Sequence, residues 1–242
     1  MVRGVFQAPV HGQDGAARGL NRVHYDTIAT GLRGLGLIAR GGFHPEAADG
    51  VPGNPVVLVM IGNAGPAMWP VFARERTPGP DAMNRWSRRH IDAVAAQLGA
   101  RALYPFDGPP WYPFQRWAQR AEPVFPSPIG MLIHAEHGLW HAYRGALAFD
   151  CAIEGLPEQG DVTSPCESCA DKPCLSTCPV AAFDGRAYDV PTCAAHLRRP
   201  EGADCLDLGC RARRACPVGR DAIYLPEQAA FHMAAFLGSR EP

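Results

Sequence analysis

The chain has 242 residues, of which 47% are hydrophobic and 19% charged, and its formal net charge is −1. A nearly neutral chain lacks the basic surface typical of nucleic-acid-binding proteins, so we infer no nucleic-acid partner. The N-terminus has no apolar signal-peptide core, and no run of about 20 apolar residues is present to span a membrane. These features predict a cytoplasmic protein with one large domain, or with a medium and a small one.

The first 155 residues alternate predicted helices and strands. Apolar residues at helical spacing mark the helices, and β-branched apolar runs mark the strands. In chain order, the patterns predict a helix over 24–40, a strand over 55–61, a helix between Asp81 and Gly99, a strand over 101–106, a helix over 113–122, and strands over 130–134 and 140–149. This alternation favours a layered domain of the α/β or α+β class over residues 1–155.

The composition changes near residue 156, where we place the start of a second, smaller domain that extends to residue 242. From there to Ile223 the chain is rich in Cys, Pro and Asp and has few apolar runs. Such a segment cannot build a hydrophobic core of its own, so it needs a further stabilising link such as a disulfide or a bound metal. Pro226 begins a predicted apolar helix, since proline is favoured at the first helical position. We expect this C-terminal helix to pack against the first domain.

The cysteines are concentrated in the second domain. Eight of the nine fall between Cys166 and Cys216, and none precedes Cys151. Disulfides are rare in cytosolic proteins, so this clustering indicates metal ligation. Cys151 lies before the motif and is predicted to be a small buried hydrophobe.

The spacing of the cysteines favours iron–sulfur clusters. Cys166 begins a C-x2-C-x4-C-x3-C-P run, which differs from the C-x2-C-x2-C-x3-C-P run of bacterial ferredoxins by two inserted residues. A second Cys-Pro pair, Cys216-Pro217, mirrors the first. We therefore predict two [4Fe–4S] clusters, with the ligands Cys166, Cys169, Cys174, Cys178, Cys193, Cys205, Cys210 and Cys216.

The ligands are expected to cross between the clusters, because the fourth cysteine of a ferredoxin run serves the other cluster. Under this hypothesis one cluster is held by Cys166, Cys169, Cys174 and Cys216, and the other by Cys178, Cys193, Cys205 and Cys210. The alternative metal is zinc, since eight cysteines also suffice for two Zn(Cys)4 sites. The two Cys-Pro endings favour iron–sulfur clusters over zinc.

Three features outside the cysteine pattern have two interpretations each. The aromatic run over 111–117 suits either the pocket of a flat cofactor or the core. The glycine-containing turn over 62–65 suits a phosphate cradle, but a plain turn is the simpler interpretation. The basic residues Arg211, Arg213 and Arg214 either offset the negative charge of the clusters or form a solvated face.

Two stretches of the first domain resemble a known family. Residues 130–147, Gly-Met-Leu-Ile-His-Ala-Glu-His-Gly-Leu-Trp-His-Ala-Tyr-Arg-Gly-Ala-Leu, resemble the corrinoid-pocket segment of epoxyqueuosine reductase and of the vertebrate cobalamin-processing (cblC-type) protein. Residues 86–94, Trp-Ser-Arg-Arg-His-Ile-Asp-Ala-Val, resemble a helix that carries a histidine in both relatives. The cysteine order is also similar to that of epoxyqueuosine reductase: a four-Cys run ending in Cys-Pro, a lone Cys193, and a terminal Gly-Cys to Cys-Pro.

The resemblance covers roughly residues 55–220 and implies a nitroreductase-like, flavin-reductase-type layered domain followed by a ferredoxin-like module. It implies a reductase in which the two clusters pass electrons to a cobalamin-like cofactor or substrate, with flavin as the alternative cofactor. The electrons would come from a redox donor protein or a small reductant. The residues implied in cofactor binding are His90, Trp140, His141, Tyr143 and Arg144. The alternative functions are a pure electron carrier and, third, a zinc-stapled interaction protein.

The chain departs from epoxyqueuosine reductase at two points. Arg88 stands where that enzyme has an acid, two residues before the helix histidine. Arg213 stands about where it has a cysteine, and Cys205 takes the place of that ligand. We therefore carry over the architecture, assign no catalytic residue and name no substrate.

Overall fold

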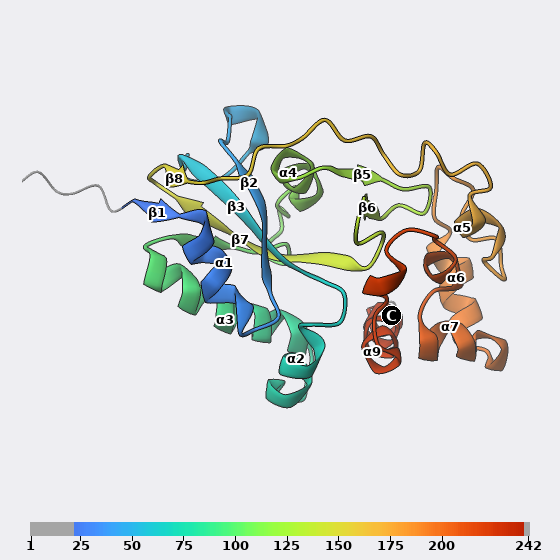
Figure 1. Cartoon of the computed structure of the whole chain (residues 1–242). Coiled ribbons are helices and arrows are strands. Elements are labelled where there is room, and N and C mark those ends of the chain that lie inside the picture. The colour runs from blue at the N-terminus through green and yellow to red at the C-terminus, as the bar shows by residue number, and fades with distance from the viewer. Residues whose placement is uncertain (1–21, 240–242) are drawn as a thin grey trace, which may run out of the picture.

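The computed structural model describes residues 22–239 and has a four-stranded sheet at its centre (Figure 1). The strands, in spatial order, are β2 (Ile38–Phe43), β3 (Val57–Ala64), β7 (His141–Phe149) and β4 (Arg101–Leu103). Every neighbouring pair is antiparallel. The prediction of a mixed α/β fold is confirmed, and the antiparallel sheet gives it the α+β form.

Helices cover both faces of this sheet. Residues Val57 to Ile61 of β3 are fully buried, and their successive side chains point to opposite faces. The odd-numbered ones pack in one core and the even-numbered ones in another. The first core is shared with α1 (Tyr25–Arg33), α2 (Trp69–Glu75) and α3 (Ala82–Leu98), and the second with α4 (Phe114–Ala121). The continuous apolar run in β3 therefore reflects burial on both faces.

Short strands border the central sheet. β1 (Val23–His24) pairs in parallel with β8 (Ile153–Glu154), and β5 (Val124–Pro126) forms a hairpin with β6 (Leu132–His134). A 3-10 turn, η1 (Ala47–Asp49), precedes β3. The β5–β6 hairpin extends from the sheet toward the last third of the chain (Figure 1).

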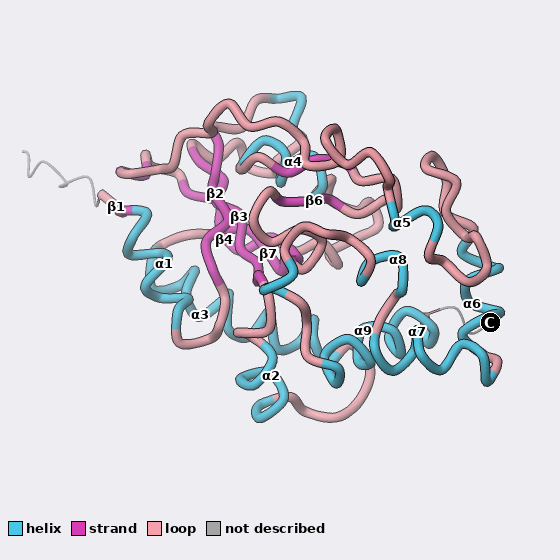
Figure 2. The backbone as a smooth tube through the Cα atoms, turned by 45° about the vertical axis from the view of Figure 1, so that its right-hand side comes forward, coloured by secondary structure: helices cyan, strands magenta, loops and turns pink. Residues whose placement is uncertain are grey.

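The cysteine-rich segment, residues 156–225, follows β8 and consists of short helices joined by loops (Figure 2). Its helical elements are α5 (Pro173–Ser176), α6 (Val190–Leu197), η2 (Pro200–Gly202), α7 (Ala203–Leu208), α8 (Arg211–Arg214) and η3 (Arg220–Ala222). Phe183 of this segment packs in one apolar cluster with Ile129 and Ile133 of the β5–β6 hairpin. The boundary at residue 156 stays a prediction, but the apolar cluster of the segment draws on residues from both sides of it.

The C-terminal helix, α9 (Pro226–Gly238), lies beside α7 and reaches the first core (Figure 2). Its Phe231 ring centroid lies 5.5 Å from that of Trp69 and 5.2 Å from that of Phe72, both on α2. The prediction that this helix packs against the N-terminal part of the chain is confirmed. Across residues 22–239, no helix combines the length and the apolar character needed to cross a membrane.

Several predicted elements differ from the observed ones. The helix predicted over 24–40 ends at Arg33, because Gly36 adopts a left-handed φ of 65° and the chain then enters β2. The strand predicted over 101–106 ends at Leu103, and the strand predicted over 130–134 begins only at Leu132. The sequence patterns also do not predict α2, β5, β8 or the short helices of the cysteine-rich segment.

A close backbone contact joins the turn after β6 to the cysteine-rich segment. Gly138 has a φ of 55°, and a Cβ atom there would lie 2.1 Å from the Val218 carbonyl oxygen. Gly219 has a φ of 71°, and a Cβ atom there would lie 2.3 Å from the His137 carbonyl. Both positions therefore require glycine, and the contact fixes the turn against the loop that follows Cys216-Pro217.

We expect Gly138→Ala to destabilise the protein by about 1–3 kcal/mol more than Gly130→Ala, because only the first variant forces a methyl group into the backbone contact. Gly130 is a matched control, since it has a similar left-handed φ of 78° and nothing within 4 Å of an added Cβ. Urea unfolding midpoints of the two variants measure the difference. Equal midpoints would show that the contact does not constrain the turn.

Candidate metal centres and the adjoining cavity

Four thiols line a cavity between the cysteine-rich segment and the β5–β6 hairpin. They belong to Cys166, Cys169, Cys174 and Cys216, which we name the first thiol set. The wall also includes Pro128 and Ile133 from the hairpin. Residues from 128 to 218 thus combine at one place, although the cysteines alone span only the segment from 166 to 216.

Four other thiols line a separate cavity in the same segment. They belong to Cys178, Cys193, Cys205 and Cys210, which we name the second thiol set. Phe183 and Met233 of α9 complete the walls. The two sets are the same as those of the crossed arrangement: Cys174 and Cys178 lie four residues apart but face different cavities. Their ligation of metal stays a prediction.

The thiols within each set are close enough to influence one another. Burial, followed by the neighbouring thiols of Cys216, Cys174 and Cys169, raises the pKa of Cys166. Burial also raises the pKa of Cys193, and Cys178 and Cys205 add to the shift. All nine cysteines are free, so no disulfide relieves this crowding. Converging thiols whose ionisation is mutually unfavourable are suited to a cationic cluster that neutralises several thiolates at once.

Backbone N–H groups already point at the sulfur atoms. The Ala182 N–H donates to Cys178 Sγ over 3.3 Å, and the Val218 N–H donates to Cys216. Further N–H donors from α8 reach Cys210. Hydrogen bonds of this kind stabilise thiolates and set the reduction potentials of iron–sulfur clusters. The donor set therefore fits two [4Fe–4S] clusters.

A compact group of potential ligand atoms lies outside the two thiol sets. Within the described residues 22–239, one ligand atom each of His134, Glu136 and His137 lie within 4.8 Å of one another. This group is a hydrogen-bonded turn, because His134 Nδ1 accepts the N–H groups of Glu136 and His137.

A larger cavity of about 410 Å³ adjoins the second thiol set, and we name it the junction cavity. It lies where the β5–β6 loop, the residue before β7, the cysteine-rich segment and α9 meet. Cys193 and Cys210 of the second thiol set form part of its wall. Trp140, Phe183 and Phe236 contribute aromatic surface. A cavity of this size and lining is typical of small-molecule sites.

Arginine provides the positive charge of the junction cavity. The Arg213 guanidinium lies over the rings of Trp140 and Tyr224, 4.4 and 4.5 Å from their centroids. It donates two hydrogen bonds to the Leu139 carbonyl oxygen, 3.1 Å from Nε and 2.7 Å from Nη2. Of the three predicted basic residues, Arg211 and Arg214 instead pair with Asp204. Arg213 therefore links the cysteine-rich segment to the residues just before β7.

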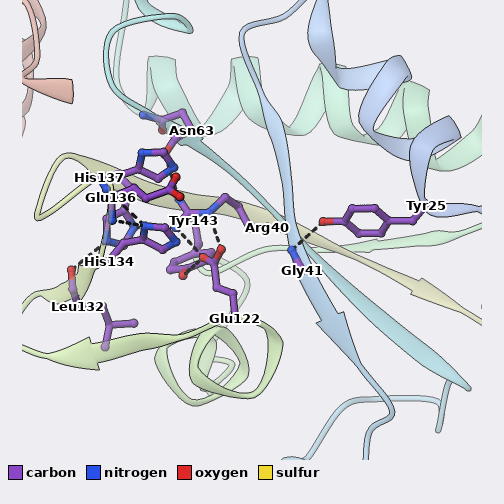
Figure 3. A network of polar contacts seen from close by, with 11 residues as sticks. Tyr25, Arg40, Gly41, Asn63, Glu122, Leu132, His134, Glu136, His137 and Tyr143 are labelled. Carbon is purple, nitrogen blue, oxygen red and sulfur yellow. Dashed lines mark hydrogen bonds and ion pairs between the residues drawn. The ribbon is translucent and has the colours of Figure 1, made fainter. Parts of the chain in front are cut away.

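His141 and Tyr143 belong to a different, buried polar network around Arg40. Figure 3 labels Tyr143, Arg40 and Glu122 of this network. The Arg40 guanidinium pairs with Glu122, with distances of 3.1 Å from Nε to Oε2 and 2.5 Å from Nη2 to Oε1. The Tyr143 hydroxyl also donates to Glu122, and His141 Nδ1 lies 3.3 Å from Arg40 Nη2. Burial first, and then the Arg40 charge, lowers the pKa of His141 to about 3, so its ring is neutral at pH 7.

The structure only partly brings together the residues that the resemblance implies in cofactor binding. Trp140 lines the junction cavity, whereas His141 and Tyr143 line a smaller one of about 180 Å³. Arg144 donates to Asn63 Oδ1 over 3.0 Å. His90 lies on α3, where its Nε2 is 2.9 Å from Glu75 Oε2, and it lines neither cavity.

The residue at the acid position of epoxyqueuosine reductase, Arg88, has a structural environment of its own. It pairs with Asp107 and lies 4.2 Å from the centroid of the Tyr104 ring. Most of the aromatic run over 111–117 belongs to the core, because Phe114 and Trp117 on α4 are buried and Tyr112 packs against them, whereas Trp111 is 63% exposed. The turn over 62–65 begins inside β3 rather than forming a separate cradle.

Sequence reasoning did not identify four residues of these sites. Arg40 and Glu122 are 82 positions apart, and no local pattern links them. His232 lines the junction cavity from α9, where apolar spacing indicated core packing. Tyr188 also lines it and hydrogen-bonds the Cys193 thiol. The sequence signal available for Tyr188 is its position five residues before Cys193, a predicted ligand.

Comparison with known proteins supports the architecture. No protein-family model matches the chain, and no curated protein matches it in sequence. The fold is similar to that of epoxyqueuosine reductase from Streptococcus thermophilus, with a TM-score of 0.50 and 14% identity over 84% of this chain and 69% of that one. The enzyme from Bacillus subtilis also matches, with a TM-score of 0.46 and 15% identity over 77% of this chain and 58% of that one. The chain therefore shares, over most of its length, the fold of epoxyqueuosine reductase.

Proposed function

We propose that this protein is an iron–sulfur reductase in which two [4Fe–4S] clusters, one at each thiol set, deliver electrons to an acceptor in the junction cavity. The observation that carries the proposal is that Cys193 and Cys210 of the second set are also part of the wall of that cavity. An acceptor there would lie against the ligands of a cluster, with no further residue between them. The clusters supply single electrons, and the protein tunes them through hydrogen bonds and burial.

A route for electrons follows from the same geometry. The first thiol set lies toward the hairpin, and Lys172 beside it is exposed. A redox donor protein or a small reductant would deliver electrons at this cluster, and the second cluster would pass them to the cavity. The existence of the cavity favours a reductase over a pure carrier, because a carrier needs no acceptor pocket beside its cluster.

A corrinoid is the acceptor that the resemblance implies, and its size can be compared with the volumes of the cavities. The junction cavity has about 410 Å³ and the cavity at His141 about 180 Å³. Cavities of about 300–1,000 Å³ enclose drug-sized ligands, and a whole cobalamin is much larger than these. The described cavities therefore fit a smaller acceptor, such as a flavin, better than an enclosed corrinoid.

The test is anaerobic purification of the iron-replete protein, with iron, sulfide, zinc, cobalt and flavin measured on one sample. We expect about eight irons per chain and a broad absorbance near ~400 nm that dithionite bleaches. Titration with cobalamin and with flavin then separates reductase from carrier. Reducible clusters without binding of either would favour the carrier, and a colourless, zinc-loaded protein would contradict the proposal.

We expect Tyr188→Phe to lower the reduction potential of the second cluster. The Tyr188 hydroxyl donates to the Cys193 sulfur, and this hydrogen bond strengthens when reduction adds negative charge. A loss of about 1 kcal/mol corresponds to about 40 mV for one electron. An EPR-monitored redox titration measures the shift. Tyr112→Phe is the control, since that ring stacks on Trp117, and an equal shift in both variants would refute the assignment.

A further inference from the structure

The two arginines beside the junction cavity carry positive charge that no acidic side chain balances. Neither Arg144 nor Arg213 takes part in an ion pair with any carboxylate of residues 22–239. Arg213 bonds only a backbone carbonyl, and Arg144 donates its Nε–H to the amide oxygen of Asn63. By contrast, the buried Arg40 pairs with Glu122. Buried or half-buried charges are normally paired, so this pair of cations is an exception.

The two charges act on the same place. Burial first, and then the charges of Arg144 and Arg213, lowers the pKa of His232 to about 3. Burial also lowers the pKa of Arg144, to which Arg213 contributes, and no carboxylate is among the groups that act on it. His232 and Arg213 line the junction cavity. His232 and Arg213 therefore lie together in the wall, both beside the Tyr224 ring, which is 5.6 Å from the His232 ring and 4.5 Å from the Arg213 guanidinium. Arg144 does not line the cavity but lies behind this part of the wall, because it bonds Asn63, whose side-chain amide donates to the Tyr224 hydroxyl.

The remainder of the cavity wall is apolar and aromatic. Trp140, Phe183 and Phe236 present rings, and Met131 and Met233 present flexible thioethers. Such a wall favours a flat, conjugated ring system, because ring faces and thioethers stack on it. The guanidinium groups favour a phosphate or carboxylate substituent at one end.

We propose that the junction cavity binds a planar conjugated molecule whose phosphate or carboxylate group is held by Arg213, with the charge of Arg144 behind the wall adding to the attraction. The inference deepens the proposed function and rests on it, since it states the chemical class of the acceptor. The anionic group occupies the arginine side, and the ring lies along the wall that includes Cys193 and Cys210.

Two pairs of probes test this inference on the anaerobically prepared full-length protein. The members of each pair share a ring system and differ in an anionic group: flavin mononucleotide against riboflavin, and anilinonaphthalene sulfonate against N-phenylnaphthylamine. Equilibrium titration by fluorescence gives each dissociation constant. We expect the anionic member of at least one pair to bind about tenfold to a hundredfold more tightly, which corresponds to one or two charge-assisted hydrogen bonds.

Substitutions of the two arginines test whether they cause the preference for the anionic probe. Arg213→Gln is expected to reduce it to about threefold or less, and Arg144→Gln to reduce it by a smaller factor, because Arg144 acts from behind the wall. Arg213→Lys retains part of the preference because the charge remains. Arg101→Gln is the matched control. It removes the same charge from an exposed arginine of β4 that donates to the Pro52 carbonyl, and it should leave the preference unchanged. Thermal unfolding and iron content confirm that each variant is folded.

Three results would overturn the inference. They are an absence of binding by both anionic probes, equal binding within both pairs, and a preference that survives both glutamine substitutions. The clusters are measured separately on the same samples through iron content and absorbance. A protein without clusters that still prefers the anionic probes would refute the proposed function and leave the anion site standing. A protein with both clusters but no preference for the anionic probes would refute the anion site and leave the proposed function standing.

Discussion

The variant Cys174→Ala/Cys178→Ala is expected to lose both clusters, whereas Cys174→Ala/Cys216→Ala is expected to lose only one. The first pair lies four residues apart in sequence but faces two different cavities, and the second pair is distant in sequence but shares one. Iron content should fall from about eight per chain to about zero in the first variant and about four in the second. The contrast tests the crossed arrangement independently of any single substitution.

Cys151→Ala is the control for this experiment, because Cys151 packs beside the first core and lines neither thiol cavity. It should retain about eight irons. Retention of about four irons by Cys174→Ala/Cys178→Ala would show that these two cysteines serve the same cluster. Loss of all iron from Cys174→Ala/Cys216→Ala would show that the two clusters do not assemble independently.

The second large effect is expected from Arg40→Met, which leaves the Glu122 carboxylate without its cationic partner. The two side chains are 2% and 13% exposed, so water does little to compensate the lost charge. Removing one partner of a buried ion pair typically costs about 3–5 kcal/mol. We expect the free energy of unfolding, measured in urea by tryptophan fluorescence, to fall by that amount.

Two further variants make the result interpretable. Arg89→Met breaks the ion pair between Arg89 and Glu75, whose arginine is 54% exposed, and should cost less than about 1 kcal/mol. Arg40→Met/Glu122→Met removes both charges and should recover part of the loss, because no uncompensated charge then stays buried. A loss below about 1 kcal/mol in Arg40→Met alone would mean that Glu122 finds another partner or becomes protonated.

The composition of the thiol sets is predictable from sequence, because the ligands of a cluster are supplied by short loops with characteristic spacing. The strand around Val57 is also predictable, since burial on both faces requires a continuous apolar run. The first helix illustrates the limit of local patterns. Ile38 continues the helical spacing of Ile28 and Leu32, yet it lies in β2, because backbone conformation at Gly36 overrides the periodicity.

The walls of the sites are not predictable in the same way. Pro128 and Ile133 meet the first thiol set only through the hairpin, and Arg40 meets Glu122 only through the sheet. These contacts join residues distant in sequence, and no periodic pattern marks them. His90 shows a related limit. The sequence predicts that His90 lies on a helix, but the residues that this helix face contacts depend on tertiary packing. Its observed partner is Glu75 of α2.

The hairpin wall of the first thiol set has a consequence for how this protein can be dissected. A fragment beginning at residue 156 would contain all eight cysteines but would leave Pro128 and Ile133 behind. It would also lack Gly138, so the Val218 carbonyl would lose its close backbone contact. The cysteine-rich segment is therefore not a self-contained unit: grafted onto another protein, it would carry all eight thiols but lack part of the wall that surrounds the first thiol set.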